Sequence, residues 1–317
     1  MSERKEFDAK ENETMKALKN YLTILLVSAA LAADAKLNIV ATTADFGALA
    51  QAVGGELVNV TVLAKPTEDP HFVDAKPSYI LKLNRADVLI EGGAELESGW
   101  LQPLLDGARN AKLAAGQPGR IAIAEGLAML EVPTELDRSK GDLHAKGNPH
   151  FMTDPAHGRP AATRIAAGLG AVDPAHKANY EANLQAWLKQ LDVKQAEWQK
   201  LLAPFAGTRV ASFHNSWPYF ARRFNLKMDL FLEPKPGIPP SPAQLANVLE
   251  TIKREHIKAI VIEPYQNRHM ADIVAKETGA QLLDFAQYPG ALKGTGDDYL
   301  ALIDKLVNSL ATALGAK

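Results

Sequence analysis

The 317-residue chain contains no cysteine. Its absence excludes a disulfide framework, a thiolate metal site and an acylated cysteine that would anchor the mature chain to a membrane. A dominant charge is lacking too, because 35 Lys and Arg residues stand against 37 Asp and Glu residues. This balance argues against nucleic acid or an anionic membrane surface as the main partner.

The first 35 residues have the features of a leader peptide. A basic region with Lys16 and Lys19 precedes an apolar run of about a dozen residues, and small residues follow at positions 33–35. We expect a cleavable signal peptide at residues 1–35, a mature protein that begins at Lys36, and translation that starts at Met15. The expected product is a freely soluble periplasmic protein.

Residues 173–203 lack glycine, and after Pro174 they also lack proline until Pro204. Asp173 suits a helix cap and Pro174 a first helical position, so this stretch predicts one long helix of roughly 43 Å. Its apolar side chains follow the spacing of a single face. We interpret the helix as a rigid spine between two lobes, residues 36–172 and 204–317; the alternative is an amphipathic helix inside one domain.

Strand and helix patterns alternate on both sides of the predicted spine. Short apolar runs predict strands at residues 37–43, 58–63, 87–91, 209–213, 257–263 and 281–283, and helices are expected at 46–53, 77–84, 98–108, 271–278 and 297–314. The predicted fold class is α/β, with two lobes of mostly parallel sheet joined by the spine helix. In such sheets a ligand lies beyond the carboxyl ends of the strands.

Four side chains are candidate metal ligands at or near such positions: His71, His150, His214 and Asp284. Three imidazoles and one carboxylate can complete a tetrahedral shell around a first-row divalent ion. The spacing also permits an alternative for each residue, a solvated or capping histidine and a turn-forming aspartate.

Two further residues are candidates for auxiliary roles. His144 lies on a glycine-flanked loop six residues before His150, and Glu263 ends the strand predicted at 257–263. Glu263 would either accept a hydrogen bond from an imidazole or be a satisfied buried carboxylate.

An enzyme is a rival interpretation of the same ligands. Three protein ligands and a bound water would make a secreted mononuclear zinc hydrolase, with Glu263 as general base. The sequence has no HExxH helix, P-loop or GxSxG elbow to favour it. We therefore expect no catalytic residues and no enzyme.

Several motifs together resemble the cluster A-I solute-binding proteins of metal ABC transporters, the ZnuA- and TroA-like family. They extend in order over the mature chain: Glu68-Asp69-Pro70-His71, Gly147-Asn148-Pro149-His150, Ser212-Phe213-His214, Pro240-Ser241-Pro242, Ile262-Glu263-Pro264 and Glu277-Thr278-Gly279-Ala280. The resemblance implies two α/β lobes joined by a rigid helix, with the metal held between them by His71, His150, His214 and Asp284.

The resemblance also implies the cargo and the partners. Zinc binders of this family have His where this chain has His214, whereas manganese binders tend to have Glu, and imidazole suits Zn(II) better than Mn(II). We expect Zn(II) as cargo, a monomer, a membrane permease of an ABC transporter as partner, and a metallochaperone as an accessory. The alternatives are Mn(II), Fe(II) or a metal chelate as cargo.

The chain departs from the family at two places. The loop from Lys140 to Lys146 is short, with only Asp142 and His144 in place of a long His- and Asp-rich loop. Asn215 replaces the Asp that is common in relatives. Because the spine is stiff, we expect metal release through rearrangement of loops around His150 or Asp284 and slight tilting of the lobes, without wide hinge closure.

Overall fold

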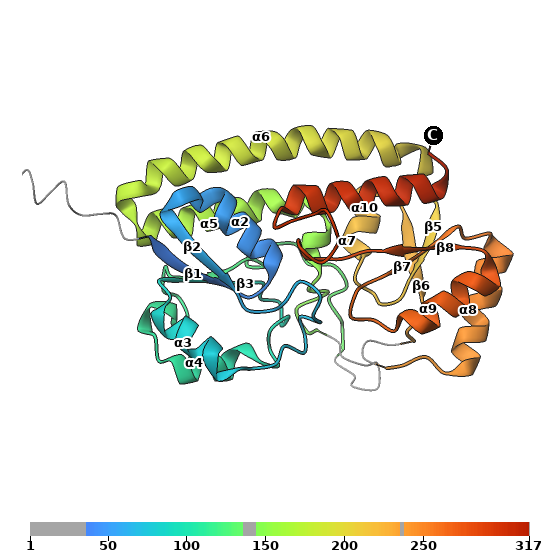
Figure 1. The fold of residues 1–317 in the computed structure, drawn as a ribbon, viewed down its shortest axis with the longest axis horizontal. Helices are drawn as coiled ribbons and strands as arrows, with labels where there is room; N and C mark the ends of the chain where they lie inside the picture. Colours follow the sequence, from blue (N-terminus) through green and yellow to red (C-terminus); the bar gives the residue numbers. More distant parts are fainter. Residues whose placement is uncertain (1–35, 136–143, 235–237, 317) are drawn as a thin grey trace, which may run out of the picture. The chain divides into compact units, whose positions relative to one another are not determined.

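Two four-stranded parallel sheets organise the computed structural model, which describes residues 36–135, 144–234 and 238–316. The first sheet has the order β2-β1-β3-β4, with β1 Leu37–Ala41, β2 Val58–Val62, β3 Val88–Glu91 and β4 Arg120–Ala122. The second has the order β6-β5-β7-β8, with β5 Arg209–Ser212, β6 Lys227–Phe231, β7 Ala259–Ile262 and β8 Gln281–Asp284. Both sheets therefore have the same topology (Figure 1).

The central strands β3 and β7 are buried because helices cover both faces of each sheet. All residues of β3 and β7 are buried, as expected for apolar runs in a parallel sheet. The helices in the described residues are α2 Ala44–Gly54, α3 Pro77–Arg85, α4 Leu101–Ala108, α5 Gly158–Val172, α6 Lys177–Leu202, α7 Pro218–Phe224, α8 Pro242–Glu255, α9 Arg268–Thr278 and α10 Tyr299–Leu314.

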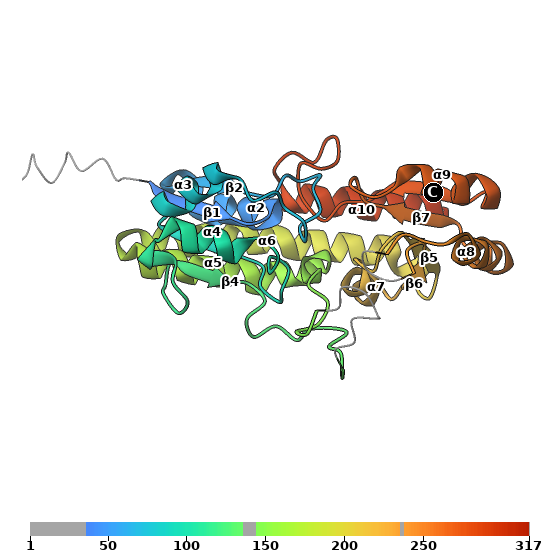
Figure 2. The ribbon, with the colours of Figure 1, turned by 90° about the horizontal axis from the view of Figure 1, so that it is seen from below.

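Helix α6 extends along both lobes, as Figures 1 and 2 show. Near its start the Asn183 side chain donates a hydrogen bond to the carbonyl of Val53 in α2. Near its end the Trp198 indole donates to Asp304 of α10 at 3.1 Å. The long helix thus contacts the first lobe at one end and the second lobe at the other.

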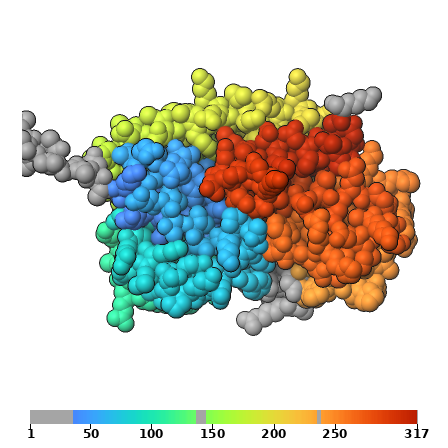
Figure 3. All heavy atoms as spheres, viewed as in Figure 1, coloured from blue at the N-terminus to red at the C-terminus, as the bar shows by residue number. Residues whose placement is uncertain are grey.

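One apolar core runs through both lobes. It includes Ile39 and Leu49 beside the first sheet, Tyr180 and Trp198 on α6, and Leu306 on α10. Two smaller clusters lie on the opposite faces of the sheets, under α3 and α4 in the first lobe and under α8 and α9 in the second. In the space-filling view the blue and cyan surface of the first lobe meets the orange surface of the second directly (Figure 3).

The predicted fold class is confirmed: two α/β lobes with parallel sheets and a long helix. Four elements, β4, α5, α7 and β6, were not predicted from the sequence. β4 has only three residues, and α5 begins with Gly-Arg-Pro, which masks its helical pattern. β6 alternates charged and apolar residues beside a buried strand, and its pairing with β5 is irregular.

Some predictions fall outside the described residues. These are the leader at 1–35, Asp142 in the short loop, and residues 235–237 of the proline-rich run at 233–242, which its composition predicts to be a stiff loop near the cleft. Residues 37–317 form one compact unit, and the site described below lies within it. No helix in the described ranges is both long enough and apolar enough to cross a membrane.

Candidate metal centre between two lobes

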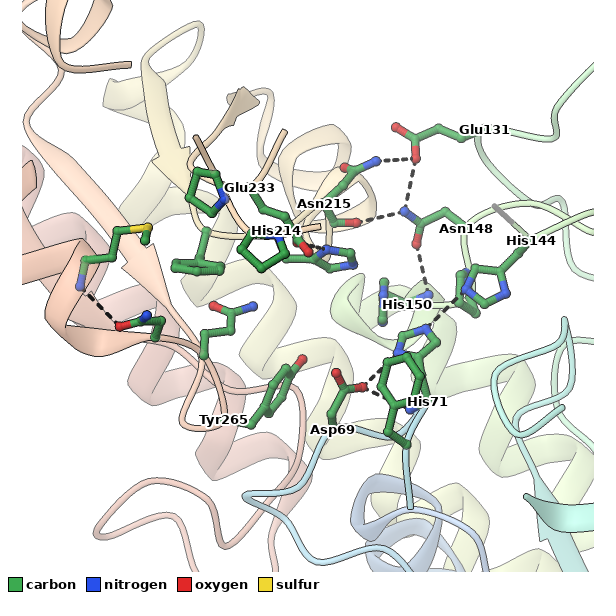
Figure 4. Close-up of a pocket in the computed structure, with 18 of the residues that line it drawn as sticks. Asp69, His71, Glu131, His144, Asn148, His150, His214, Asn215, Glu233 and Tyr265 are labelled. Carbon is green, nitrogen blue, oxygen red and sulfur yellow. Dashed lines mark hydrogen bonds and ion pairs between the residues drawn. The ribbon is translucent and has the colours of Figure 1, made fainter. Parts of the chain in front are cut away.

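A cavity of about 340 Å³ lies at the loops that follow β2, β5, β6 and β7. Because these strands are parallel within each sheet, their carboxyl ends deliver side chains to one region. The lining includes four histidines, His71, His144, His150 and His214 (Figure 4). Three carboxylates, Asp69, Glu131 and Glu233, lie in the same lining, and Phe72, Phe213 and Met270 add an apolar part.

The four imidazole rings are close neighbours. The ring centroid of His71 lies 5.1 Å from those of both His144 and His150, and that of His150 lies 5.6 Å from the centroid of His214. The longest of these distances, between His71 and His214, is 6.5 Å. The Nε2 atoms of His71 and His144 are 3.1 Å apart.

These distances are near those of a shared metal ion. Two imidazoles bound tetrahedrally to one Zn(II) through Nε2 would have ring centroids about 5 Å apart. Within the described ranges no group of three or more His, Asp or Glu side chains already meets the geometry of a metal site.

Each of three histidines has a partner at Nδ1. Asp69 Oδ1 lies 2.9 Å from His71 Nδ1, and Glu233 Oε2 lies 2.6 Å from His214 Nδ1. Gln287 Oε1 lies 2.8 Å from His150 Nδ1. An acceptor at Nδ1 favours the tautomer that has its proton on Nδ1 and its lone pair on Nε2. Metal-ligating histidines commonly have this arrangement.

Glu263 acts on an imidazole through Gln287. Its carboxylate is buried and accepts hydrogen bonds from Ser216 and from the side-chain amide of Gln287, each at 2.7 Å. The Gln287 amide is thereby oriented with its oxygen toward His150. Burial raises the pKa of Glu263 above its usual value, while its hydrogen-bond donors oppose that shift.

The pKa values of His150 and His214 are shifted in opposite directions. Burial, followed by the nearby His71 and His214, lowers the pKa of His150 well below its usual value, which keeps this imidazole neutral and ready to bind a metal. Burial would lower the pKa of His214 as well, but the hydrogen bond and charge of Glu233 outweigh it and raise that pKa. A metal ion bound by His214 would therefore have to compete with a proton up to a higher pH than at an ordinary histidine.

The segment that carries His150 is fastened to the second lobe, although it precedes α6 in sequence. The Tyr219 hydroxyl donates to the carbonyl of Asn148 at 2.7 Å, and the Asn148 amide donates to the carbonyl of Asn215, the residue after His214. Arg223 of α7 forms two hydrogen bonds with the buried carboxylate of Asp154. His150 and His214 are thus positioned by the same lobe.

The structure does not bring Asp284 to the cavity. Its side chain is 58% exposed and pairs with Arg268 of α9. β8 is the edge strand of its sheet, and Asp284 is its exposed last residue. Of the four ligands expected from sequence, three therefore lie together with His144, and Asp284 lies apart.

Three residues that contact the imidazoles were not predicted from the sequence as part of the site: Asp69, Glu233 and Gln287. Asp69 lies two residues before His71 in the same motif, and Glu233 is the first residue of the proline-rich run at 233–242. These positions in the sequence could have indicated both residues. Gln287 gives no signal in the sequence, because it reaches His150 from a position 137 residues away. Asn215, the departure from relatives, donates to Glu131 at 2.8 Å, and its carbonyl accepts from Asn148.

Comparison with known protein families decides the wider identity. The profile of the family described as ZnuA, zinc-uptake complex component A, periplasmic, matches residues 39–313. The chain belongs to this family. The members of this family are substrate-binding proteins of metal ABC transporters, so the chain is not an enzyme, and its partners are a metal ion and a membrane permease.

Individual relatives agree on the class of protein and differ in the metal. A crystal structure of ZnuA is 27% identical, with a TM-score of 0.75, and the match covers 88% of this chain and 99% of that one. The metal ABC transporter substrate-binding lipoprotein ScbA of Streptococcus cristatus is 22% identical over 89% of this chain and 90% of its own length. The iron ABC transporter substrate-binding lipoprotein MtsA of Streptococcus pyogenes is 23% identical over 87% and 89%. These similarities place the protein outside the cytoplasm, in the periplasm or at the cell surface.

Proposed function

We propose that this protein captures Zn(II) in the cavity between its lobes and delivers it to the permease of an ABC transporter for import. The observation that carries the proposal is the group of four imidazoles, His71, His144, His150 and His214, of which three have their Nδ1 atoms occupied. Imidazole nitrogen suits Zn(II), whereas Mn(II) prefers oxygen ligands.

The proposed ligand set replaces Asp284 with His144. Asp284 is exposed and paired with Arg268, whereas His144 Nε2 lies 3.1 Å from the same atom of His71. Asp69, Glu233 and Gln287 would orient three of the imidazoles, and Glu263 would hold Gln287. We infer further that the protein acts as a monomer after cleavage of a signal peptide and that a metallochaperone can load it.

The test is metal competition on the purified, stripped and reloaded protein. We expect one tightly held zinc ion per chain, preferred over manganese and iron, and weaker binding in His71→Ala, His150→Ala and His214→Ala. His269→Ala is the matched control, because His269 is exposed on α9 and is not among the residues that line the cavity. A preference for manganese or iron would reassign the cargo, and unchanged binding in all three variants would refute the site.

Delivery needs a cellular test. A deletion strain of the native host should grow poorly when zinc is chelated, and the parent gene but not the His150→Ala variant should restore growth. Added zinc in excess should restore growth in every strain. Restoration by the His150→Ala variant under chelation would contradict zinc delivery through this cavity.

A further inference from the structure

The turn at residues 92–101, between β3 and α4, has an unusual backbone. Three consecutive residues, Gly93, Ala94 and Glu95, have φ angles of 73°, 50° and 69°. Residues other than glycine rarely adopt this left-handed region, and two of them in succession persist only where the surrounding structure holds them.

Glu97 holds this turn from inside the first lobe. Its side chain is 4% exposed and accepts hydrogen bonds from the backbone amides of Gly92 at 2.7 Å and Gly93 at 3.1 Å. The Thr42 hydroxyl, at the end of β1, donates to the same carboxylate at 2.7 Å. The buried carboxylate therefore fixes the start of the left-handed run to the strand ends of the sheet.

The other side of the turn faces the segments that carry the two first-lobe histidines. Glu95 accepts a hydrogen bond from the backbone amide of Ala145, the residue after His144, at 2.5 Å. The Trp100 indole donates to the carbonyl of Pro70, the residue before His71, at 2.9 Å. One turn thus supports both histidines whose Nε2 atoms lie 3.1 Å apart.

We propose that Glu95 is a positioning residue that sets His144 as the fourth zinc ligand, opposite His71. The proposal rests on the function proposed above, because it needs the imidazoles to bind the ion. The left-handed run projects the Glu95 carboxylate toward the His144 segment, while the neighbouring carboxylates Glu91 and Glu125 pair with Arg120 and Arg164 instead. Removal of the Glu95 carboxylate breaks the hydrogen bond that holds the His144 segment, while the His144 side chain itself stays in the protein.

The experiment compares Glu95→Ala, Glu95→Gln and His144→Ala with the parent protein. Zinc release into an excess of a chromophoric chelator gives the rate, and X-ray absorption spectroscopy gives the number of imidazoles around zinc. Glu125→Ala is the matched control, because Glu125 lines a second cavity together with Glu95 but pairs with Arg164. Glu95→Gly removes the carboxylate and suits the positive φ, so it replaces Glu95→Ala if that variant does not fold.

We expect Glu95→Ala to release zinc about 10- to 100-fold faster and to lose one imidazole from the zinc shell, as loss of an outer partner does at other metal sites. Glu95→Gln keeps an acceptor oxygen, so its zinc release rate should be closer to that of the parent. In a His144→Ala background, Glu95→Ala should add nothing, since it acts through that histidine.

Two results would overturn the role of Glu95. One is a parent-like release rate in Glu95→Ala and Glu95→Gly together with faster release in His144→Ala. The other is an effect of Glu95→Ala that persists at full size in the double variant. Unchanged zinc binding in His71→Ala and His150→Ala is a separate result, and it refutes the proposed function as a whole.

Discussion

Three histidines of the cavity, His71, His150 and His214, have a partner at Nδ1, which leaves Nε2 for the proposed metal ion. The partners differ in charge, since Asp69 and Glu233 are carboxylates and Gln287 is an amide. A carboxylate strengthens the imidazole as a ligand but also favours its protonated form, whereas an amide orients the ring without adding charge. Affinity and sensitivity to acid are therefore set at different residues.

The first prediction concerns acid sensitivity through Glu233. Binding requires a neutral imidazole, and the raised pKa of His214 makes protons compete with zinc at a higher pH than for an ordinary histidine. Glu233→Gln should lower that pKa, so the loss of affinity on acidification should begin at a lower pH, while affinity at pH 8 falls about 10- to 100-fold. Zinc affinities measured from pH 5.5 to 8 test this, and parallel curves for both proteins would contradict it.

The second prediction concerns Asp45, a buried carboxyl group at the start of α2. Burial raises its pKa from 3.8 to about 6, although the Thr43 hydroxyl donates to it. Well below pH 3.8 the group is neutral in both the folded and the unfolded state. Between its two pKa values the folded state binds more protons, so the free energy of unfolding falls as pH rises. Above pH 6 the full cost, roughly 3 kcal/mol, is present.

Asp45→Asn should remove this cost at high pH. Urea unfolding at pH 5 and pH 8 should show a smaller loss of stability with pH in the variant than in the parent. Glu125→Gln, an exposed carboxyl group on the same lobe, is the control and should behave as the parent does. An equal loss in Asp45→Asn and the parent would show that Asp45 does not titrate in this way.

Three of the site's histidines could be found from sequence because each follows a buried strand or lies in a motif quoted for the family. The fourth expected ligand, Asp284, was placed by the same reasoning, but the structure pairs it with Arg268 on the outside of an edge strand. Partners such as Gln287 depend on contacts over more than 100 residues, which no local pattern encodes.

At the scale of elements, periodicity predicted the long helix well. The expected range of 173–203 became α6 Lys177–Leu202, preceded by a 3-10 turn at Pro174–His176. Short elements were missed because three- to seven-residue segments such as β4 and α7 contain too few residues to display a period. The sheet order could not be predicted, because strand pairing is decided by tertiary packing.

The third prediction tests the contribution of α6 to stability. Leu191 is fully buried in the middle of the helix, whereas Val193, two residues later, is 55% exposed. Leu191→Ala should reduce the free energy of unfolding by about 2–5 kcal/mol, because it leaves a cavity in the core. Val193→Ala is the matched control and should change it by less than about 0.5 kcal/mol.

Denaturant unfolding measures both variants, and zinc affinity should stay at the parent value in each, because neither residue lines the cavity. A similar loss of stability in both variants would mean that α6 is held by something other than its buried face.

At the scale of the whole molecule, the continuous core restricts the movement of the lobes. The buried cluster passes from the first sheet through α6 to α10, and Asp154 with Arg223 fastens the His150 segment to the second lobe. Wide opening would expose apolar surface and break these contacts.

The fourth prediction follows from this restriction. Solution X-ray scattering of the zinc-free and zinc-loaded protein should give the same radius of gyration within the error of the measurement, while hydrogen exchange slows in the loops around His144 and His214. A clear fall in radius of gyration on zinc addition would instead indicate hinge closure of the lobes.

The shared core also restricts how this protein could have arisen and how it can change. If the chain were divided at α6, core residues such as Tyr180, Trp198 or Leu306 would be exposed to water. Neither lobe could therefore be exchanged for a lobe of another protein without the other. The four histidines, in contrast, lie outside this core at the cavity and can be replaced one at a time. We therefore expect the two lobes to evolve together as one unit, whereas the preferred metal ion can change through single substitutions at the cavity.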